Sequence, residues 1–446
     1  MAEFDLILRG VALLPDGTRP AAIGVRDSLI AAVGPLDAGW SAAIDETLPA
    51  DTVLTPGIVD THVHVNEPGR TDWEGFASAT AAAAVGGVTT IIDMPLNSIP
   101  PTTTVPALEA KRAAAAPQAA IRVGFWGGAI PDSLGHLREL HEAGVFGFKA
   151  FLSPSGVDEF PHLTSEQLRA ALAEIADFDG LLIVHAEDPA QLRDELVDGR
   201  DYAAFVASRP DAAETSAIDT IIDAVRVTGG RAHILHLSSA EALPAIRAAK
   251  AEGLPLTVET CPHYLTLEAE HIADGATAAK CCPPVRSHEN REALWAALAD
   301  GTIDLIASDH SPATAELKLA GDGDFGVAWG GISGLQLSLA AVWTEAERRG
   351  FALADVVGWM SGATAAFAGL HDRGAIREGT LADLVAFAPG RSFVVDATRL
   401  QHKNAVSAYA GETLRGVAVA TWVGGRLAQR DGLLPNPWVG SLVARP

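Results

Sequence analysis

Eight short apolar segments, separated by segments with helical character, constrain the fold of this 446-residue chain more than any other feature. Each is a nearly continuous apolar run, as expected for a parallel strand that is buried on both faces. Eight such strands with intervening helices predict a (β/α)8 barrel, with an open doubly wound sheet as the alternative. That alternative requires a glycine-rich phosphate-binding turn after an early strand, and the sequence has none there. The predicted strands cover 53–65, 88–94, 121–126, 145–151, 181–185, 232–237, 256–260 and 303–308.

The segments between these strands have the composition and the stop signals of helices. Several of them end at glycine, which readily adopts the left-handed backbone conformation that commonly follows a helix. Helical crossovers of this kind are the usual connections between parallel strands. The predicted helices cover 73–85, 105–116, 134–143, 165–176, 217–227, 240–251, 289–298 and 335–349.

The two ends of the chain differ from the middle, because they contain short strand candidates and turns without a long helical segment. This pattern covers residues 1–52 and returns over residues 373–446. We therefore predict an α/β protein made of two units. Residues 53–372 would form the (β/α)8 TIM barrel, and the two terminal segments would pair into a small β-sandwich-like domain beside it.

Composition limits the partners that this chain can have. The formal net charge is -24, which argues against nucleic acid or an anionic membrane surface. The 3 cysteines include an adjacent pair, so a disulfide framework is implausible and a reducing compartment fits. The amino-terminal segment has no apolar signal core, and no apolar run is long enough to span a membrane. We expect a cytoplasmic protein that acts on a small molecule.

Residues of the types that bind metals stand at the ends of five of the predicted strands. His62 and His64 are two residues apart on the first strand, so their side chains point the same way. Because the carboxyl ends of barrel strands surround one opening, the later residues should lie near them. Singly, each has a structural explanation, such as a hydrogen-bonded core histidine or an ion-paired lysine. Together they indicate a metal site, composed of His62, His64, Lys149, His185, His236 and Asp309. By the same alternation His233 faces away from His236 and is expected to be structural.

The order His-x-His, Lys, His, His, Asp resembles the binuclear-metal amidohydrolase superfamily, and the resemblance covers essentially the whole chain. It implies that CO2 carboxylates Lys149 to N6-carboxylysine and that the carbamate bridges two divalent metal ions. A cationic lysine would repel these ions, whereas a carbamate supplies negative charge.

The resemblance also implies how the remaining ligands are divided. His62, His64 and Asp309 would hold one metal, and His185 and His236 would hold the other. A bridging hydroxide would attack the substrate carbonyl, and Asp309 would act as the catalytic residue that carries its proton to the leaving nitrogen. Such ligands suit Zn²⁺ best and also suit Co²⁺, Mn²⁺ or Fe²⁺.

Further motifs resemble the cyclic amidases, and among them the allantoinases. Asn-Glu-Pro-Gly at 66–69 follows the histidine pair, and Asn66 stands where dihydroorotases have an arginine that binds a substrate carboxylate. Met-Pro-Leu-Asn at 94–97, Ala-Trp-Gly-Gly-Ile-Ser-Gly-Leu-Gln at 328–336 and residues 402–411 also resemble the allantoinase pattern. The implied substrate is a neutral cyclic ureide, allantoin, opened to allantoate in purine catabolism. Its expected contacts are Asn97, Cys282 and Gly331, with Cys282 in place of the usual serine.

Two alternatives remain. The first is a cyclic amidase of the hydantoinase or dihydropyrimidinase type, although these enzymes carry a tyrosine in the loop after the carboxylated lysine and residues 151–157 contain none. The second is a non-catalytic scaffold protein of the same superfamily, which would be expected to lose metal ligands. The resemblance further implies a homotetramer.

Overall fold

The predicted barrel is confirmed in the computed structural model, which describes residues 3–435 and 438–446. Its strands are all parallel and lie in two groups. Chain continuity from β8 into β9 joins the groups on one side, and a parallel bridge between Val63 and His310 closes the other. The strands are β6 (Ile58–Val63), β7 (Val88–Asp93), β8 (Arg122–Phe125), β9 (Gly127–Gly128), β10 (Phe148–Phe151), β11 (Leu181–His185), β12 (Arg231–Ile234), β13 (Leu256–Thr260) and β14 (Leu305–Ile306).

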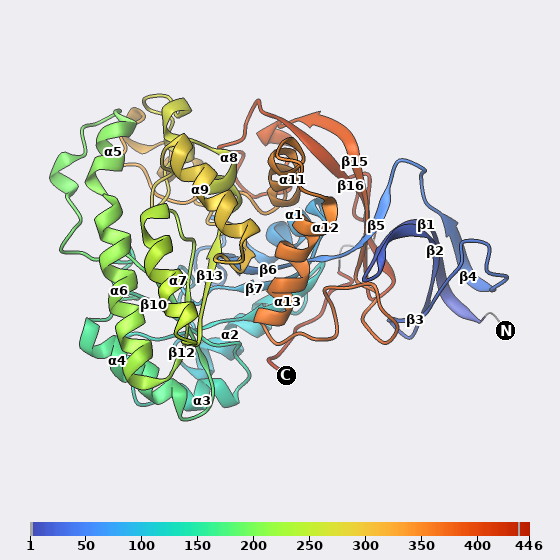
Figure 1. The fold of residues 1–446 in the computed structure, drawn as a ribbon, viewed down its shortest axis with the longest axis horizontal. Coiled ribbons are helices and arrows are strands. Elements are labelled where there is room, and N and C mark those ends of the chain that lie inside the picture. Colours follow the sequence, from blue (N-terminus) through green and yellow to red (C-terminus); the bar gives the residue numbers. More distant parts are fainter. Residues whose placement is uncertain (1–2, 436–437) are drawn as a thin grey trace.

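Helices surround the barrel on its outer face, as Figure 1 shows. Helix α4 illustrates how the sequence sets their ends, because Thr164 and Gln167 form a reciprocal capping box at its start. The helices are α1 (Phe76–Gly86), α2 (Val105–Ala115), α3 (Leu137–Glu142), α4 (Ser165–Ala176), α5 (Tyr202–Ser208), α6 (Asp211–Thr228), α7 (Leu243–Ala251), α8 (Pro262–Thr266), α9 (His288–Ala299), α10 (Ala315–Lys318), α11 (Ser338–Arg348), α12 (Leu353–Val357) and α13 (Ala363–Phe367).

The two ends of the chain share one eight-stranded sheet beside the barrel (Figure 1). Strand β5 is central to it, since it pairs with β1 on one side and with β15 on the other. Leu8, Ile23, Leu54 and Trp422 belong to its own apolar core. The strands are β1 (Phe4–Leu14), β2 (Gly17–Arg26), β3 (Leu29–Gly34), β4 (Ala42–Thr47), β5 (Val53–Pro56), β15 (Leu384–Val394), β16 (Thr413–Val423) and β17 (Arg426–Arg430).

The predicted first barrel strand, 53–65, is divided in the structure between two sheets. Residues before Gly57 form β5 of the terminal sheet, and the barrel strand begins at Ile58. Pro56-Gly57 marks the division locally, but nothing in this stretch reveals that its first part is paired with β15, more than 300 residues later. We propose that the boundary between the two units lies after Pro56, in place of the division of 1–52 and 373–446 from 53–372.

The last residues of the chain return to the barrel. The backbone of Ser441 accepts a hydrogen bond from Val123 of β8, and Val443 donates one back to Val123. We therefore propose that the carboxyl-terminal segment belongs with the barrel. Over residues 3–435 and 438–446, no helix combines the length and apolar character needed to cross a bilayer.

Candidate metal centre and active site

The six predicted ligand residues all line one cavity of about 410 Å³ at the carboxyl ends of the barrel strands. Each is almost completely buried. They come from β6, β10, β11 and the turns that follow β6, β12 and β14. The end of a parallel barrel where strands run into βα loops is where catalytic groups converge. The structure thus brings together His62, His64, Lys149, His185, His236 and Asp309.

His62, His64 and Asp309 form the first half of this cluster. One ligand-type atom of each lies within 4.8 Å of the other two. Oδ1 of Asp309 is 3.1 Å from Nε2 of His62 and 3.6 Å from Nε2 of His64. Burial acts to lower the pKa of His62, but the carboxylates of Asp309 and Glu259 outweigh it and raise this pKa to about 9. The pocket therefore favours positive charge at this position, which a divalent cation could supply.

His185 and His236 form the second half. Nδ1 of His185 lies 3.0 Å from Nε2 of His236. The His236 ring is also 5.4 Å from the His62 ring, between centroids, so the two halves adjoin. Burial lowers the pKa of both His185 and His236, which keeps these imidazoles neutral and able to donate a lone pair.

Lys149 lies on β10, is 1% exposed and lines the same cavity as both halves. Its Nζ is 4.6 Å from the centre of the Phe151 ring. Burial lowers the pKa of Lys149 to about 8, although Asp309 and Glu259 act to raise it. A fraction of the side chain is therefore an uncharged amine near neutral pH. That form can add to CO2, as formation of a carbamate requires.

Two of the site residues occupy a backbone conformation that side chains rarely adopt. His236 has φ 36 and Asp309 has φ 44, both in the left-handed region. A non-glycine residue held there costs on the order of 1–3 kcal/mol, and such strain clusters at functional sites. Both side chains line the cavity, so the strained conformation coincides with the site.

Buried nitrogens in this cluster support the fit of metal ions. Nδ1 of His64 and Nδ1 of His236 are buried and have no hydrogen-bond partner among the described residues. Most buried polar atoms have a partner, so such atoms require an explanation. Four imidazoles, one carboxylate and one lysine able to become a carbamate form a donor set that suits divalent transition metals.

Glu259 on β13 is a contact of the site that the sequence analysis missed. Its Oε1 bonds Nδ1 of His62, and its Oε2 lies 3.1 Å from Nε2 of His233. Nδ1 of His233 in turn lies 2.8 Å from Oγ1 of Thr257. His233 is thus placed as the strand alternation predicted, behind the site. A carboxylate of this kind fixes the orientation of a metal-binding imidazole. The only sequence signal was a charged residue inside an apolar strand.

We predict that Glu259→Gln weakens metal binding by about 10- to 100-fold, because the amide cannot hold His62 as the carboxylate does. Competition with a chelator measures this affinity. Glu214→Gln is the matched control, since Glu214 is equally buried but pairs with Arg286. Equal affinities for the Glu259 variant and wild type would show that this carboxylate does not support the site.

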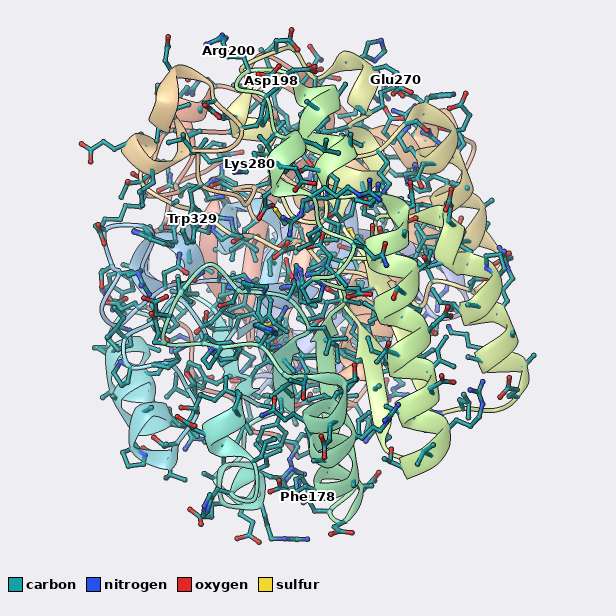
Figure 2. The ribbon with its side chains drawn as sticks, turned by 90° about the vertical axis from the view of Figure 1, so that its left-hand side faces the viewer. Phe178, Asp198, Arg200, Glu270, Lys280 and Trp329 are labelled. Atoms are coloured by element: carbon teal, nitrogen blue, oxygen red, sulfur yellow. The ribbon has the colours of Figure 1, made fainter. Side chains whose placement is uncertain are left out.

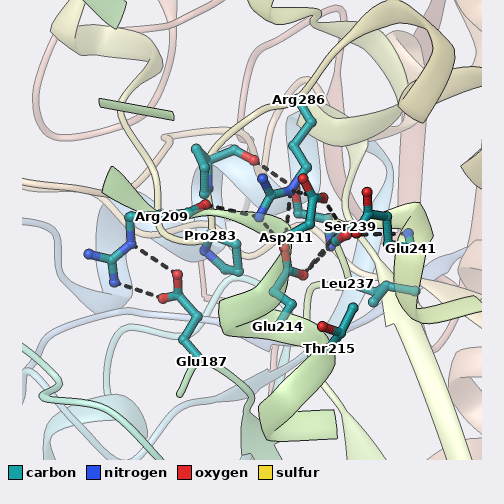
Figure 3. A network of polar contacts seen from close by, with 12 residues as sticks. Glu187, Arg209, Asp211, Glu214, Thr215, Leu237, Ser239, Glu241, Pro283 and Arg286 are labelled. Carbon is teal, nitrogen blue, oxygen red and sulfur yellow. Dashed lines mark hydrogen bonds and ion pairs between the residues drawn. The ribbon is translucent and has the colours of Figure 1, made fainter. Parts of the chain in front are cut away.

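A second carboxylate, Glu187, holds His185. Oε2 of Glu187 lies 2.8 Å from Nε2 of His185, and Arg209 donates to both oxygens of Glu187 at 2.9 and 2.7 Å. Figure 3 shows this pair beside a second one, between Arg286 and Glu214. Burial acts to raise the pKa of Glu187, but Arg209 outweighs burial and holds this pKa well below its usual range. Glu187 therefore stays anionic, and His185 presents Nδ1 to the cluster.

The three predicted substrate-contact residues line the same cavity. Asn97 lies in the turn after β7 with φ 64, and its carbonyl accepts a hydrogen bond from Arg70. Cys282 is partly buried. Gly331 has φ 114, and a Cβ there would lie 2.3 Å from the Ser311 carbonyl oxygen, so the backbone requires glycine.

Asn66 does not line the cavity. Its side chain donates to the carbonyl of Pro312, 3.2 Å away, and so joins the loop after β6 to the loop after β14. Asn66, which stands where dihydroorotases have a carboxylate-binding arginine, is thus a structural contact between loops.

Two lysines hold the loop that follows β14 over one side of the cavity. Nζ of Lys318 donates to the carbonyls of Lys280 and Trp329, at 2.7 and 3.1 Å. Nζ of Lys280 donates to the carbonyl of Ala328 at 2.5 Å. Burial lowers the pKa of Lys318 to about 7. Cys281 and Cys282 act to raise this pKa, but burial outweighs them.

This pKa predicts how stability depends on pH. Above pH 7 the folded chain has released the Lys318 proton, whereas the unfolded chain retains it until its ordinary pKa of 10.5. The free energy of unfolding therefore rises with pH in this window, by up to about 1.4 kcal/mol per unit from this group. We expect the stability of wild type relative to Lys318→Met to increase between pH 7 and pH 10, as measured by urea unfolding. If the stabilities of the two proteins change equally with pH, the pKa of Lys318 is not lowered in the folded chain.

Together the barrel, the cluster at its carboxyl end and the terminal sheet define a hydrolase barrel of the amidohydrolase type. Residues 53–428 match the amidohydrolase family. The chain is 57% identical over 100% of both chains to an allantoinase from Streptomyces avermitilis. It is 46% identical to an allantoinase from Saccharomyces cerevisiae, over 86% of this chain and 84% of that one. The chain belongs to the amidohydrolase family, and within it to the allantoinases.

Solved structures agree with this placement. An L-hydantoinase (dihydropyrimidinase) from Arthrobacter aurescens superposes with a TM-score of 0.93 and 30% identity, covering 99% of this chain and 100% of that one. The expected resemblance to cyclic amidases is therefore confirmed. The chain is a hydrolase of the class that acts on cyclic amides.

Proposed function

We propose that this protein is an allantoinase, which hydrolyses the cyclic amide bond of allantoin to give allantoate in purine catabolism. Water adds to the ring carbonyl carbon, the carbon–nitrogen bond breaks, and the nitrogen takes up a proton. The 57% identity to an allantoinase over the full length of both chains is the observation that carries this proposal. The cluster of six ligand-type residues in one buried cavity supports it.

In this proposal the six residues hold two divalent metal ions, most simply Zn²⁺, with Co²⁺, Mn²⁺ or Fe²⁺ as alternatives. His62, His64 and Asp309 would hold one ion and His185 and His236 the other, and Lys149, carboxylated by CO2 to N6-carboxylysine, would supply a negatively charged ligand to both. When bound, the ions polarise the ring carbonyl and lower the pKa of the attacking water. In place of a proton, these ions would balance the negative charge of Asp309 and Glu259 around His62.

Asp309 carries the proton. Burial acts to raise the pKa of Asp309, but His62 outweighs it and holds this pKa well below its usual range, so the carboxylate is deprotonated and has lone pairs free to take up a proton. It lines the cavity beside the ligand histidines, where a proton leaving the attacking water can reach it. Passing that proton to the ring nitrogen lets the amide leave as a neutral amine.

Asn97, Cys282 and Gly331 contact the ureide ring in this proposal. Gly331 and its neighbours present backbone groups, because tandem glycine leaves no side chain in the way. Cys282 replaces a usual serine, and burial raises the pKa of its thiol, so it stays neutral beside a neutral substrate. A thiol is a poor hydrogen-bond donor, and binding by backbone groups tolerates that change.

The test is a substrate panel on protein loaded with divalent metal in bicarbonate buffer. We expect ring opening of allantoin to exceed that of hydantoin and dihydrouracil. Good turnover of hydantoin or dihydrouracil without turnover of allantoin would assign the chain to the hydantoinase type, which the TM-score of 0.93 makes the second candidate. Failure to bind metal at all would favour a non-catalytic scaffold.

We further propose a cytoplasmic homotetramer. The three free cysteines in the described part of the chain fit a reducing compartment. Light scattering of the purified protein measures the assembly, and a monomer would contradict this part of the proposal.

A further inference from the structure

Trp329 stands at the rim of the cavity, on the loop that follows β14. It is partly exposed, whereas the ligand-type residues below it are buried. Figure 2 shows Trp329 and Lys280 toward one end of the barrel and Phe178 at the opposite end. A substrate whose reacting amide lies among the buried ligands must therefore direct its remaining groups toward this rim.

Trp329 faces two other loops across the rim. Its ring packs edge-on against Trp73, with the centroids 5.0 Å apart, and Trp73 follows β6. On the other side, a Cβ built on Gly156 would lie only 3.3 Å from Cη2 of Trp329. Gly156 belongs to the loop after β10. The indole therefore bridges these two loops and forms part of the cavity wall at the rim.

This part of the rim is preformed because the residues around Trp329 are held by several contacts. The backbone NH of Trp329 donates to Leu317, and its carbonyl accepts from Lys318. Trp73 is held by the Arg70 guanidinium, 5.1 Å from its ring centre. Arg70 also pairs with Glu159 in the loop after β10. These contacts join the rim loops to one another.

We propose that Trp329 is a specificity-determining residue that limits the size of the group carried on the substrate ring. This inference rests on the proposed cyclic-amide hydrolysis. The indole is neutral and rigid, so it excludes large substituents by shape and does not select by charge. Small groups such as a methyl or a ureido group fit in the cavity beside the indole, whereas a larger aromatic group meets the ring.

The experiment compares hydantoin, 5-methylhydantoin and 5-benzylhydantoin in wild type and in Trp329→Ala. We expect wild type to discriminate against the benzyl compound. In the variant, the ratio of kcat/KM for benzyl to unsubstituted hydantoin should rise by about tenfold or more, because removing the indole opens space for several carbon atoms. Where a hydantoin is not turned over, the ratio of the inhibition constants of the two compounds against allantoin is compared instead, and it should shift in the same direction. Metal content should be unchanged.

Trp438→Ala is the matched control, because it removes the same side chain from a position that is 51% exposed in the carboxyl-terminal segment. Its ratio should equal that of wild type. Trp329→Phe keeps an aromatic ring and should give an intermediate ratio, which preserves the test if the alanine variant folds poorly. Equal loss on all substrates in both Trp329 variants would overturn the inference. A shifted ratio without allantoin turnover in wild type would uphold it and reject the proposed function.

Discussion

Replacing Lys149 with alanine should remove the bound metal and lower allantoin hydrolysis by about 10³-fold or more, because metal-dependent stabilisation of the transition state is worth several kcal/mol. The lysine is 1% exposed and lies among four histidines and an aspartate, so nothing else replaces its charge. Elemental analysis and an allantoin assay on the same sample measure both effects. Excess propionate should restore part of each, since a small carboxylate can occupy the space that the carbamate leaves.

Lys250→Ala is the control for this change. Lys250 lies on α7 and pairs with Asp304 outside the cavity, so its loss should leave metal content unchanged. A Lys149→Ala protein that retains full activity would exclude the carbamate. A protein that loses activity but keeps two metals would show that Lys149 is not needed to hold the metal ions and contributes to the reaction in another way.

Replacing Asp309 with asparagine should lower kcat by about 10²- to 10⁴-fold, the usual contribution of a positioned acid–base group. The amide preserves the shape of the side chain but cannot accept the proton from the attacking water. It also removes a negative charge 3.1 Å from His62, so metal affinity should fall as well. Steady-state kinetics at saturating metal separates the two effects.

Asp431→Asn is the control, because Asp431 has a similar left-handed backbone, with φ 51 against 44 for Asp309, and lies in a turn of the terminal sheet. Asparagine tolerates this conformation, so the control should keep full activity and stability. Activity of the Asp309 variant within tenfold of wild type would mean that another group carries the proton.

The sequence was sufficient to predict the barrel and to select the six residues that the structure places in one cavity. Both predictions depend on local patterns, namely apolar runs and the residue at the end of each run. The continuous strand β1 and the helix α6 were predicted only in part. Two short strand candidates in the amino-terminal segment, 5–8 and 11–14, are joined in β1 because β2 pairs along its length. Helix α6 begins at Asp211, six residues before its predicted start, since Asp211 and Glu214 stabilise its first turn.

Contacts between distant segments could not be predicted. Glu259 is nearly 200 residues from His62, and nothing local shows that the two side chains meet. The pairing of β5 with β15 could not be predicted for the same reason, because the two strands are far apart in the sequence. Glu187 differs, because it follows His185 by two residues, and that spacing was a usable signal for a side chain near the site.

The rate of allantoin ring opening, measured while metal is added back to the metal-free protein in bicarbonate, tests the binuclear site most directly. We predict that the rate rises from near zero and reaches its maximum at two metal ions per chain. Full activity without metal, a maximum at one ion, or no opening of allantoin at any metal content would contradict the proposed chemistry.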